Sequence, residues 1–215
     1  MTNRDSAIEL LNKLEFLFEK YSTEMRATTQ PYSLLMVFDY IKDYVYNPED
    51  NLVRESLLEH VGSLPIVATA FYPYINDDEV DIGKSLLMLS IHDIGELITG
   101  DEITFTKDHN HKDKEQESAM ALLDASYHDI YKDMESQTSK SAKFAKSIDK
   151  ITPDIIDYLT PANITTIRYK HFVGIEPKEI ASLILKHKRP YMLWNPFMTE
   201  FHKLLLEKIS EKLTK

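Results

Sequence analysis

Residues 90–101 read SIHDIGELITGD, a run that puts ionisable side chains into the middle of an apolar segment. Apolar residues recur over residues 82–98, Asp81 is a suitable N-cap before them, and Gly100 is suited to end a helix. The pattern predicts one strongly apolar helix over this range, buried nearly all round. From this segment and its flanks we expect an all-α fold.

The charged residues of this segment share one sector of the predicted helix. Since successive helical residues turn by about 100°, His92, Asp93 and Glu96 project in similar directions. Burying two carboxylates without compensation would cost several kcal/mol each, and a divalent cation would supply the missing positive charge. The alternative is that His92 forms a hydrogen bond within the core while the acids pair with Lys or Arg. For this segment taken alone, that alternative is the stronger one.

The composition supports helices and excludes several classes of function. The chain has 215 residues, 43% of them apolar, and only five glycines, with no Asn-Gly or Asp-Gly pair to mark short hairpins. A formal net charge of −10 argues against duplex nucleic acid as a partner. Because cysteine is absent, a metal would be held by nitrogen and oxygen ligands. There is no apolar signal core and no long uncharged run, so we expect a cytoplasmic protein without a membrane segment.

Helical periodicity and helix-breaking residues divide the rest of the chain. A polar loop is expected at residues 107–112, followed by a helix through Leu123. No linker is long enough to mark a boundary, so we expect a single domain over residues 1–215. The other predicted helices cover residues 5–21, 31–46, 53–72, 139–151, 177–185 and 197–213.

Two further segments change the interpretation of the apolar helix. Upstream, residues 54–60 read RESLLEH and end in His60, and downstream, residues 142–150 read AKFAKSIDK and contain Asp149. The order along the chain is therefore His, His-Asp, Asp. This order and the residues around it resemble the HD superfamily of metal-dependent phosphohydrolases, closest to the branch that contains the 5'-deoxynucleotidases. The resemblance covers about residues 51–157.

The resemblance implies a helical HD core, which we expect to be flanked by an N-terminal helical pair at residues 5–46 and a C-terminal helical extension at residues 177–213. It also implies one divalent metal ion with open coordination positions. Such a ligand set suits Mn, Co, Fe, Zn or Mg, and the ligand types do not select among them. A cation of this kind can bind a phosphoryl oxygen and activate water. The ligands that the resemblance implies are His60, His92, Asp93 and Asp149.

Four more residues are candidates for catalysis on, or binding of, a small phosphorylated substrate. Glu96 lies one turn beyond His92 and is placed to act as general acid or base, and the resemblance assigns Asp101 a supporting role beside it. Arg54 and Lys150 are candidates for neutralising phosphate charge, although a surface ion pair is an equal alternative for each. The expected reaction is hydrolysis of a phosphate monoester of a nucleotide or a similar small molecule.

Several alternatives stay open at this point. The substrate could instead be a cyclic nucleotide, a nucleoside triphosphate or another phosphate ester, and a non-catalytic HD protein could keep the metal for ligand sensing. The cluster His109-Asn110-His111 is best interpreted as a solvated loop. The segment Pro190–Phe197 is best interpreted as core packing, with a pocket wall or the contact of a homodimer as alternatives.

Overall fold

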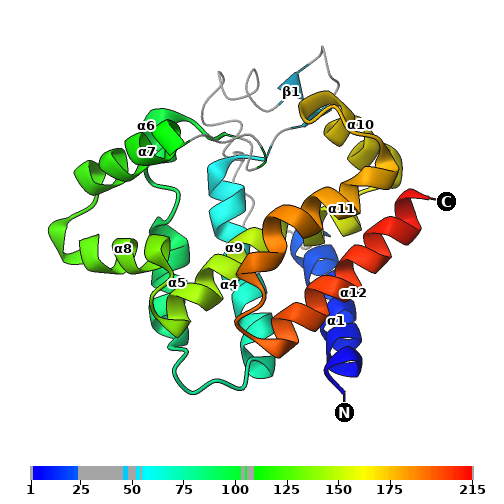
Figure 1. Ribbon diagram of the computed structural model, residues 1–215, viewed down its shortest axis with the longest axis horizontal. Coiled ribbons are helices and arrows are strands. Elements are labelled where there is room, and N and C mark those ends of the chain that lie inside the picture. The colour runs from blue at the N-terminus through cyan, green and yellow to red at the C-terminus, as the bar shows by residue number, and fades with distance from the viewer. Residues whose placement is uncertain are drawn as a thin grey trace.

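The computed structural model describes residues 2–23, 46–47, 52–53, 55–102, 105 and 109–214. Within these ranges the protein is built almost entirely of helices, which confirms the predicted all-α class (Figure 1). Two short strands, β1 (Tyr46–Asn47) and β2 (Leu52–Val53), pair in antiparallel fashion, with Tyr46 opposite Val53. The α-helices are α1 (Asn3–Thr23), α4 (Leu57–Phe71), α5 (Ile82–Ile91), α6 (Glu96–Thr99), α7 (His109–Leu122), α8 (His128–Ser136), α9 (Lys140–Leu159), α10 (Ala162–Phe172), α11 (Pro177–Lys188) and α12 (Pro196–Leu213).

Helix α9 is the centre of the hydrophobic core. It packs against α4, α5, α8 and α12, and its buried side chains include Phe144, Ile148 and Ile151 (Figure 1). Ser139 caps its first turn, because the Ser139 side chain accepts a hydrogen bond from the backbone N–H of Ala142. A helix that is covered on several sides by other helices presents little backbone to water. The residues of α9 that are not apolar are therefore held in fixed surroundings.

The first and last helices lie side by side (Figure 1). Apolar residues of α1, among them Leu10 and Leu14, are buried in the same core cluster as Phe201 of α12. At the edge of this contact, Arg4 pairs with Glu200 and Glu207 of α12 at N–O distances of 3.3 and 2.6 Å. The N-terminal helix is thereby attached to the C-terminal one. Among the described helices, none combines the length and the apolar character needed to cross a membrane.

Several predicted helices differ from those observed. The helix expected from residue 53 begins at Leu57, where Ser56 and Glu59 form a reciprocal capping box, and Pro65 remains inside it. The helix expected over residues 139–151 continues to Leu159 through Pro153. Neither α8 nor α10 was predicted. α10 lacks a clear apolar stripe, whereas α8 is amphipathic but only nine residues long. Residues 31–45 of the second expected helix lie outside the described residues, and its expected last residue, Tyr46, belongs to β1.

The helix expected over residues 82–98 is interrupted. α5 ends at Ile91, residues 92–95 form a turn, and α6 follows as a short helix. The expectation of a loop at residues 107–112 is also corrected, since α7 begins at His109 and therefore includes His111. Helix α7 packs against α6, with Ala119 and Glu115 buried, and this tertiary contact stabilises a helix whose own sequence is mostly polar.

Candidate metal centre

His92 lies at the C-cap of α5, where the chain leaves the helix and turns toward α6. The turn allows a close approach of two helices at Gly95, where an added Cβ would lie only 2.2 Å from the backbone oxygen of Glu115 in α7. A larger residue would force α7 away from this position. The interruption of the predicted helix is thus coupled to the packing of α7 over the turn that carries His92 and Asp93.

The imidazole of His92 is buried, with 2% of its surface exposed, and its ring orientation is fixed by the backbone. Nδ1 lies 2.9 Å from the backbone oxygen of Leu89, a contact that requires a proton on Nδ1. In the neutral ring the lone pair then resides on Nε2. Among the described residues Nε2 has no hydrogen-bond partner of good geometry, although it faces two carboxylates. A buried nitrogen of this kind is suited to bind a cation.

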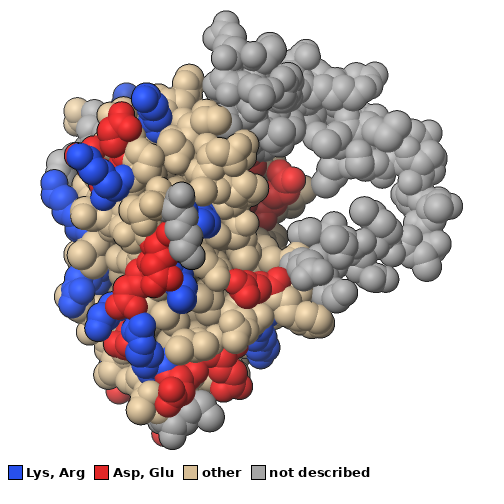
Figure 2. Space-filling model, turned by 90° about the vertical axis from the view of Figure 1, so that its right-hand side faces the viewer, with Lys and Arg blue, Asp and Glu red and all other residues tan. Residues whose placement is uncertain are grey.

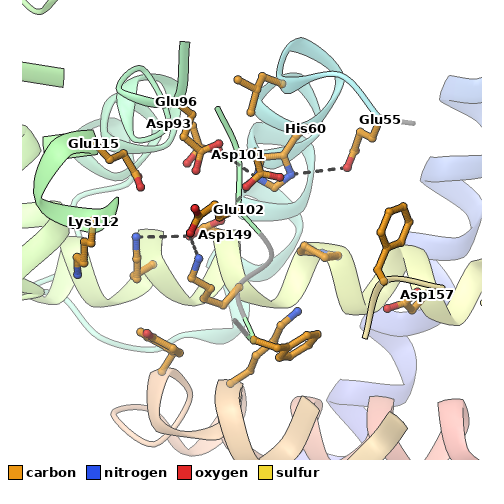
Figure 3. Close-up of a pocket in the computed structure, with 18 of the residues that line it drawn as sticks. Glu55, His60, Asp93, Glu96, Asp101, Glu102, Lys112, Glu115, Asp149 and Asp157 are labelled. Carbon is orange, nitrogen blue, oxygen red and sulfur yellow. Dashed lines mark ion pairs between the residues drawn. The ribbon is translucent and has the colours of Figure 1, made fainter. Parts of the chain in front are cut away.

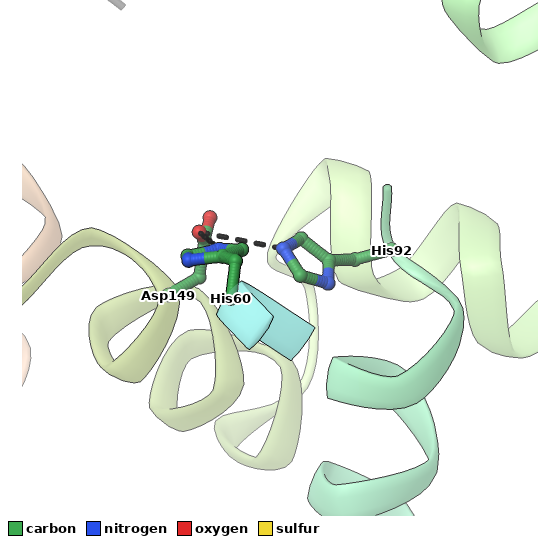
Figure 4. A group of neighbouring side chains, drawn as sticks. All are labelled: His60, His92 and Asp149. Atoms are coloured by element: carbon green, nitrogen blue, oxygen red, sulfur yellow. Dashed lines mark ion pairs between the residues drawn. The ribbon is translucent and has the colours of Figure 1, made fainter. Parts of the chain in front are cut away.

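Three helical segments bring their functional side chains to the same point (Figure 4). His60 comes from the first turn of α4 and Asp149 from the middle of α9, and each offers a ligand atom within 4.8 Å of the others and of His92. Asp149 Oδ1 lies 3.6 Å from His60 Nε2 and 3.4 Å from His92 Nε2. The two imidazole centroids are 5.8 Å apart.

Asp93 contacts both histidines from the turn after α5. Its Oδ1 is 3.0 Å from His92 Nε2 and its Oδ2 is 3.6 Å from His60 Nε2. The compact group whose ligand atoms all lie within 4.8 Å of one another consists of His60, His92 and Asp149. All four residues that the sequence predicted as ligands are nevertheless neighbours, since Asp93 contacts both imidazoles of this group.

The electrostatics of the cluster favour a positive charge at its centre. Burial alone would lower the pKa of His92, but the nearby Asp149 and Asp93 carboxylates outweigh burial and raise this pKa to about 10. The pKa of His60 is raised by the same carboxylates against the same effect of burial. For Asp149 burial would raise the pKa, yet Lys150 and His92 hold it well below its ordinary value. In the absence of a metal, a proton on His92 supplies part of the charge that a divalent cation would otherwise provide.

The centre opens into a cavity of about 580 Å³, which is in the size range of small-molecule sites (Figure 3). Glu96 and Asp101 line it close to Asp93, and Glu96 is buried with 8% of its surface exposed. Lys150 also lines it, and its Nζ lies 3.0 Å from Asp149 Oδ2. Arg54, the other residue predicted to contact phosphate, lies outside the described residues.

Sequence reasoning did not identify most of the cationic residues in the cavity. Lys146 lies 3.6 Å from Asp149 Oδ2 and 3.0 Å from Glu135 Oε1, and Lys112 lies 3.4 Å from Glu135 Oε2. Arg168 and Lys188 reach the cavity from the C-terminal helices. Only Lys146 carried a signal in the sequence, because it is three residues from Asp149 and therefore on the same face of the helix. The others come into place through the packing of α7, α10 and α11.

One face of α9 forms a continuous side of the cavity, which we call the floor. Asp149 and Asp157 lie at different places along this helix in Figure 3. Counted from Lys146, spacings of three, four, seven and eleven residues return to within about 60° of the same direction on an α-helix. The floor consists of Lys146, Asp149, Lys150, Pro153 and Asp157.

The segment Pro190–Phe197 serves two of the roles considered for it. Met192 and Phe197 are buried in the core, as predicted, whereas Tyr191 lines the cavity. Trp194 is partly buried and its Nε1 donates a hydrogen bond to Ser147 Oγ at 2.7 Å. The segment thus connects the C-terminal helices to α9.

The fold and the cluster together define an all-helical protein with a histidine and aspartate centre at the end of a cavity. Residues 48–186 match the family model described as HD domain, which is more than half of the chain, and the protein belongs to this family. No curated protein matches the chain. A crystal structure of a predicted metal-dependent phosphohydrolase from Magnetospirillum magnetotacticum MS-1 is similar, with a TM-score of 0.56 and 19% identity over 98% of this chain and 97% of that chain. This likeness concerns the fold.

Proposed function

We propose that the protein is a metal-dependent phosphohydrolase that acts on a phosphate monoester of a nucleotide or a similar small molecule. The observation that carries the proposal is His92, whose buried Nε2 lies between two carboxylates without a hydrogen-bond partner among the described residues. Membership of the HD domain family and the description of the Magnetospirillum protein support it. The proposed ligands are His60, His92, Asp93 and Asp149.

The chemistry of the donor set fits a divalent cation, since His60, His92 and Asp149 offer ligand atoms within 4.8 Å of one another and the Asp93 carboxylate contacts both imidazoles. When bound, such an ion polarises a phosphoryl oxygen and makes water more acidic. His92 contributes a ring that is held in place by Leu89, and Asp149 contributes a carboxylate that is already ionised. Metal binding therefore requires His92 to lose the proton that the neighbouring carboxylates favour, whereas Asp149 is already in its binding form.

The residues around the centre are proposed to transfer protons and to neutralise the charge of the phosphoryl group. Glu96 is buried beside Asp93 at the cavity wall, where it can accept a proton from the attacking water and return it to the leaving oxygen. Asp101 lies at the same wall and supports Glu96. Lys150 and Lys146 border Asp149 and can offset the negative charge of the phosphoryl group.

The metal site is tested first by elemental analysis. We expect the purified protein to retain about one divalent transition metal per chain after dialysis, and the His92→Ala variant to lose it, because the only buried unpartnered nitrogen of the cluster is removed. His111→Ala is the matched control, since His111 pairs with Glu102 and is not part of the cluster. Stoichiometric metal in the His92→Ala protein would contradict the assignment.

Turnover is tested with Glu96→Gln and a panel of phosphate esters, nucleotides and cyclic nucleotides. For the ester that the parent protein hydrolyses, we expect the variant to keep its metal but to lose about 10²–10⁴ in rate, the usual contribution of a positioned acid-base group. Glu117→Gln, on the exposed side of α7, should retain the parent rate. If the metal is bound and no member of the panel is hydrolysed, the protein is a binding protein of the HD family and the enzymatic proposal is wrong.

A further inference from the structure

The floor of the cavity extends well beyond the candidate metal centre. Asp157 follows Asp149 by eight residues on α9, and at 1.5 Å per residue the two lie about 12 Å apart along the helix. The centre uses only the Asp149 end. The far end, which we call the distal subsite, is formed by Asp157 together with residues of α10 and has no role in the proposed chemistry.

Asp157 fixes two neighbouring residues of α10 at the distal subsite. Its carboxylate is buried, with 2% of the residue exposed, and accepts a hydrogen bond of 2.8 Å from the Tyr169 hydroxyl. It also forms an ion pair with Arg168. The central carbon of the guanidinium lies 5.7 Å from the centre of the Tyr169 ring, within the range of a cation–π contact.

Arg168 nevertheless keeps hydrogen-bonding capacity toward the cavity. Its side chain is 36% exposed and lines the cavity, and a guanidinium has five N–H donors of which one carboxylate uses at most two. Because the buried Asp157 holds the head group in one place, little side-chain entropy remains to be lost when a ligand binds. The arrangement is that of a preorganised donor.

The walls around Arg168 are aromatic and apolar. Phe105 and Tyr169 have ring centroids 6.2 Å apart, and Phe172 lies one turn from Arg168 on α10. Pro153 and Val173 complete the wall, and all of these residues line the cavity. Flat apolar side chains next to a planar donor suit a ring that stacks on one side and accepts hydrogen bonds at its edge.

The charge of the cavity determines whether a neutral or an anionic ring is favoured at the distal subsite. Among the described residues that line it, nine are acidic and five are Lys or Arg. A divalent cation would leave an acidic excess, and the charge of Arg168 is already balanced by Asp157. A phosphoryl group would be attracted by the cation itself, whereas a second anionic group at the distal subsite would meet net repulsion.

We propose that Arg168 is a specificity-determining residue that donates hydrogen bonds to an uncharged planar ring at the distal subsite. The preferred substrates are then phosphate monoesters whose leaving group carries such a ring, with acceptor atoms, about 12 Å from the metal end. Esters with a second anionic group at that distance are disfavoured. The proposal deepens the function proposed above and rests on it for the phosphoryl end alone.

The test is calorimetric binding to the metal-loaded protein at a pH where turnover is slow or after substitution of Glu96 by Gln. The ligands are the four common nucleoside 5'-monophosphates and ribose 5-phosphate, which has the phosphate but no ring. We expect at least one nucleotide to bind about tenfold or more tightly than ribose 5-phosphate, the usual effect of hydrogen bonds from a charged donor. The variant Arg168→Lys should lose this preference, because the ammonium still pairs with Asp157 but lacks the planar fork.

A second variant tests whether the effect of Arg168→Lys arises from a change in folding. Phe172→Ala leaves the Asp157 pair intact and removes part of the wall, so it should weaken nucleotide binding while leaving ribose 5-phosphate binding unchanged. Equal affinity of the parent protein for all five ligands, no measurable binding of any, or an equal loss for all ligands in Arg168→Lys would overturn the inference. Ring-dependent binding without hydrolysis would support the inference and refute the enzymatic proposal. Hydrolysis at the same rate in the parent protein and in both variants would support the enzymatic proposal and refute the inference.

Discussion

At the scale of single residues, Gly95 shows how strongly the candidate centre depends on backbone packing. Its backbone is helical, so the glycine is not needed for a special conformation. It is needed because α7 passes so close that a methyl group would overlap the carbonyl group of Glu115. The turn carrying Asp93 and the helix carrying Glu115 are thereby fixed relative to each other across the cavity.

Gly95→Ala should therefore destabilise the protein by about 1–3 kcal/mol, the usual effect of inserting a methyl group into a packed contact. The control is Gly62→Ala in α4, where an added Cβ meets nothing within 4 Å and should stabilise the helix by about 0.5–1 kcal/mol. Urea unfolding of both variants measures the two effects. Similar free energies of unfolding for the two variants would show that α7 does not approach Gly95 as described.

At the scale of secondary structure, α9 depends on α12 for its C-terminal end. Lys212 of α12 donates hydrogen bonds to the backbone oxygens of Asp157, Tyr158 and Thr160. These carbonyl groups belong to the last turn of α9 and the residue after it, and they have no partners within the helix. A lysine at this position satisfies them and places a positive charge at the negative end of the helix dipole.

The variant Lys212→Met should lower the free energy of unfolding by about 1–3 kcal/mol, since it removes the lysine donor from three backbone carbonyl groups, of which that of Asp157 keeps the Thr165 hydroxyl. Lys208→Met serves as the comparison, because Lys208 pairs with Glu211 on the same helix with both side chains exposed. That pair should contribute less than about 1 kcal/mol. Thermal or urea unfolding distinguishes the two, and an equal effect would mean that Lys212 does not cap α9.

The sequence predicted elements where an apolar stripe and a breaker coincide, and it did less well elsewhere. The helix expected at residues 5–21 corresponds to α1, and the one expected at residues 197–213 corresponds to α12. In contrast, α10 has a mixed sequence with Thr165 and Thr166 in its middle, and its position is set by contacts with α11 and α12. The interruption between α5 and α6 could not be predicted, because it depends on α7 approaching Gly95.

The same distinction applies to the candidate site. His60, His92, Asp93 and Asp149 could be grouped because their order along the chain follows a family pattern. The neighbourhood of Asp157 and Arg168 had no such pattern, since the two residues become partners only when α10 folds back beside α9. The sequence therefore predicted the residues of the charged cluster. It did not predict the part of the cavity that is formed by tertiary packing.

At the scale of the whole molecule, basic and acidic side chains are interspersed over the face shown in Figure 2, without a continuous basic band among the residues described there. Inside the molecule, a second set of charges lies in the core. Lys188 Nζ is 2.5 Å from Asp154 Oδ1, and His202 Nε2 is 3.9 Å from Asp154 Oδ2. These residues come from α11, α9 and α12, so the charges join three helices.

This buried set makes the stability of the protein dependent on pH. Burial, and after it the positive charges of Lys188 and Arg189, lower the pKa of His202 to about 4. The unfolded chain, with an ordinary histidine pKa of 6.5, takes up a proton first as the pH falls, so stability is complete above pH 6.5 and is lost toward pH 4. Burial raises the pKa of Asp154, which has the opposite effect at lower pH.

Between pH 7 and pH 5 we therefore expect His202 to account for a loss of about 2 kcal/mol in the free energy of unfolding. Urea titrations at the two pH values measure it. The variant His202→Gln should show a smaller difference between them, whereas His171→Gln, at an exposed position of α10, should keep the difference of the parent protein. An unchanged difference in His202→Gln would show that this histidine is not the titrating group.

The floor provided by α9 also sets how the cavity could change its length in evolution or by design. Both ends of the cavity lie on one helix. The distance between them is therefore set by the number of α9 residues that separate them, at about 1.5 Å per residue. One residue inserted between Lys150 and Asp157 would rotate the far end by about 100° and remove it from the cavity. Four inserted residues would bring it back to nearly the same face, about 6 Å further away. Insertions in α9 can accordingly lengthen this cavity only in steps of about one turn.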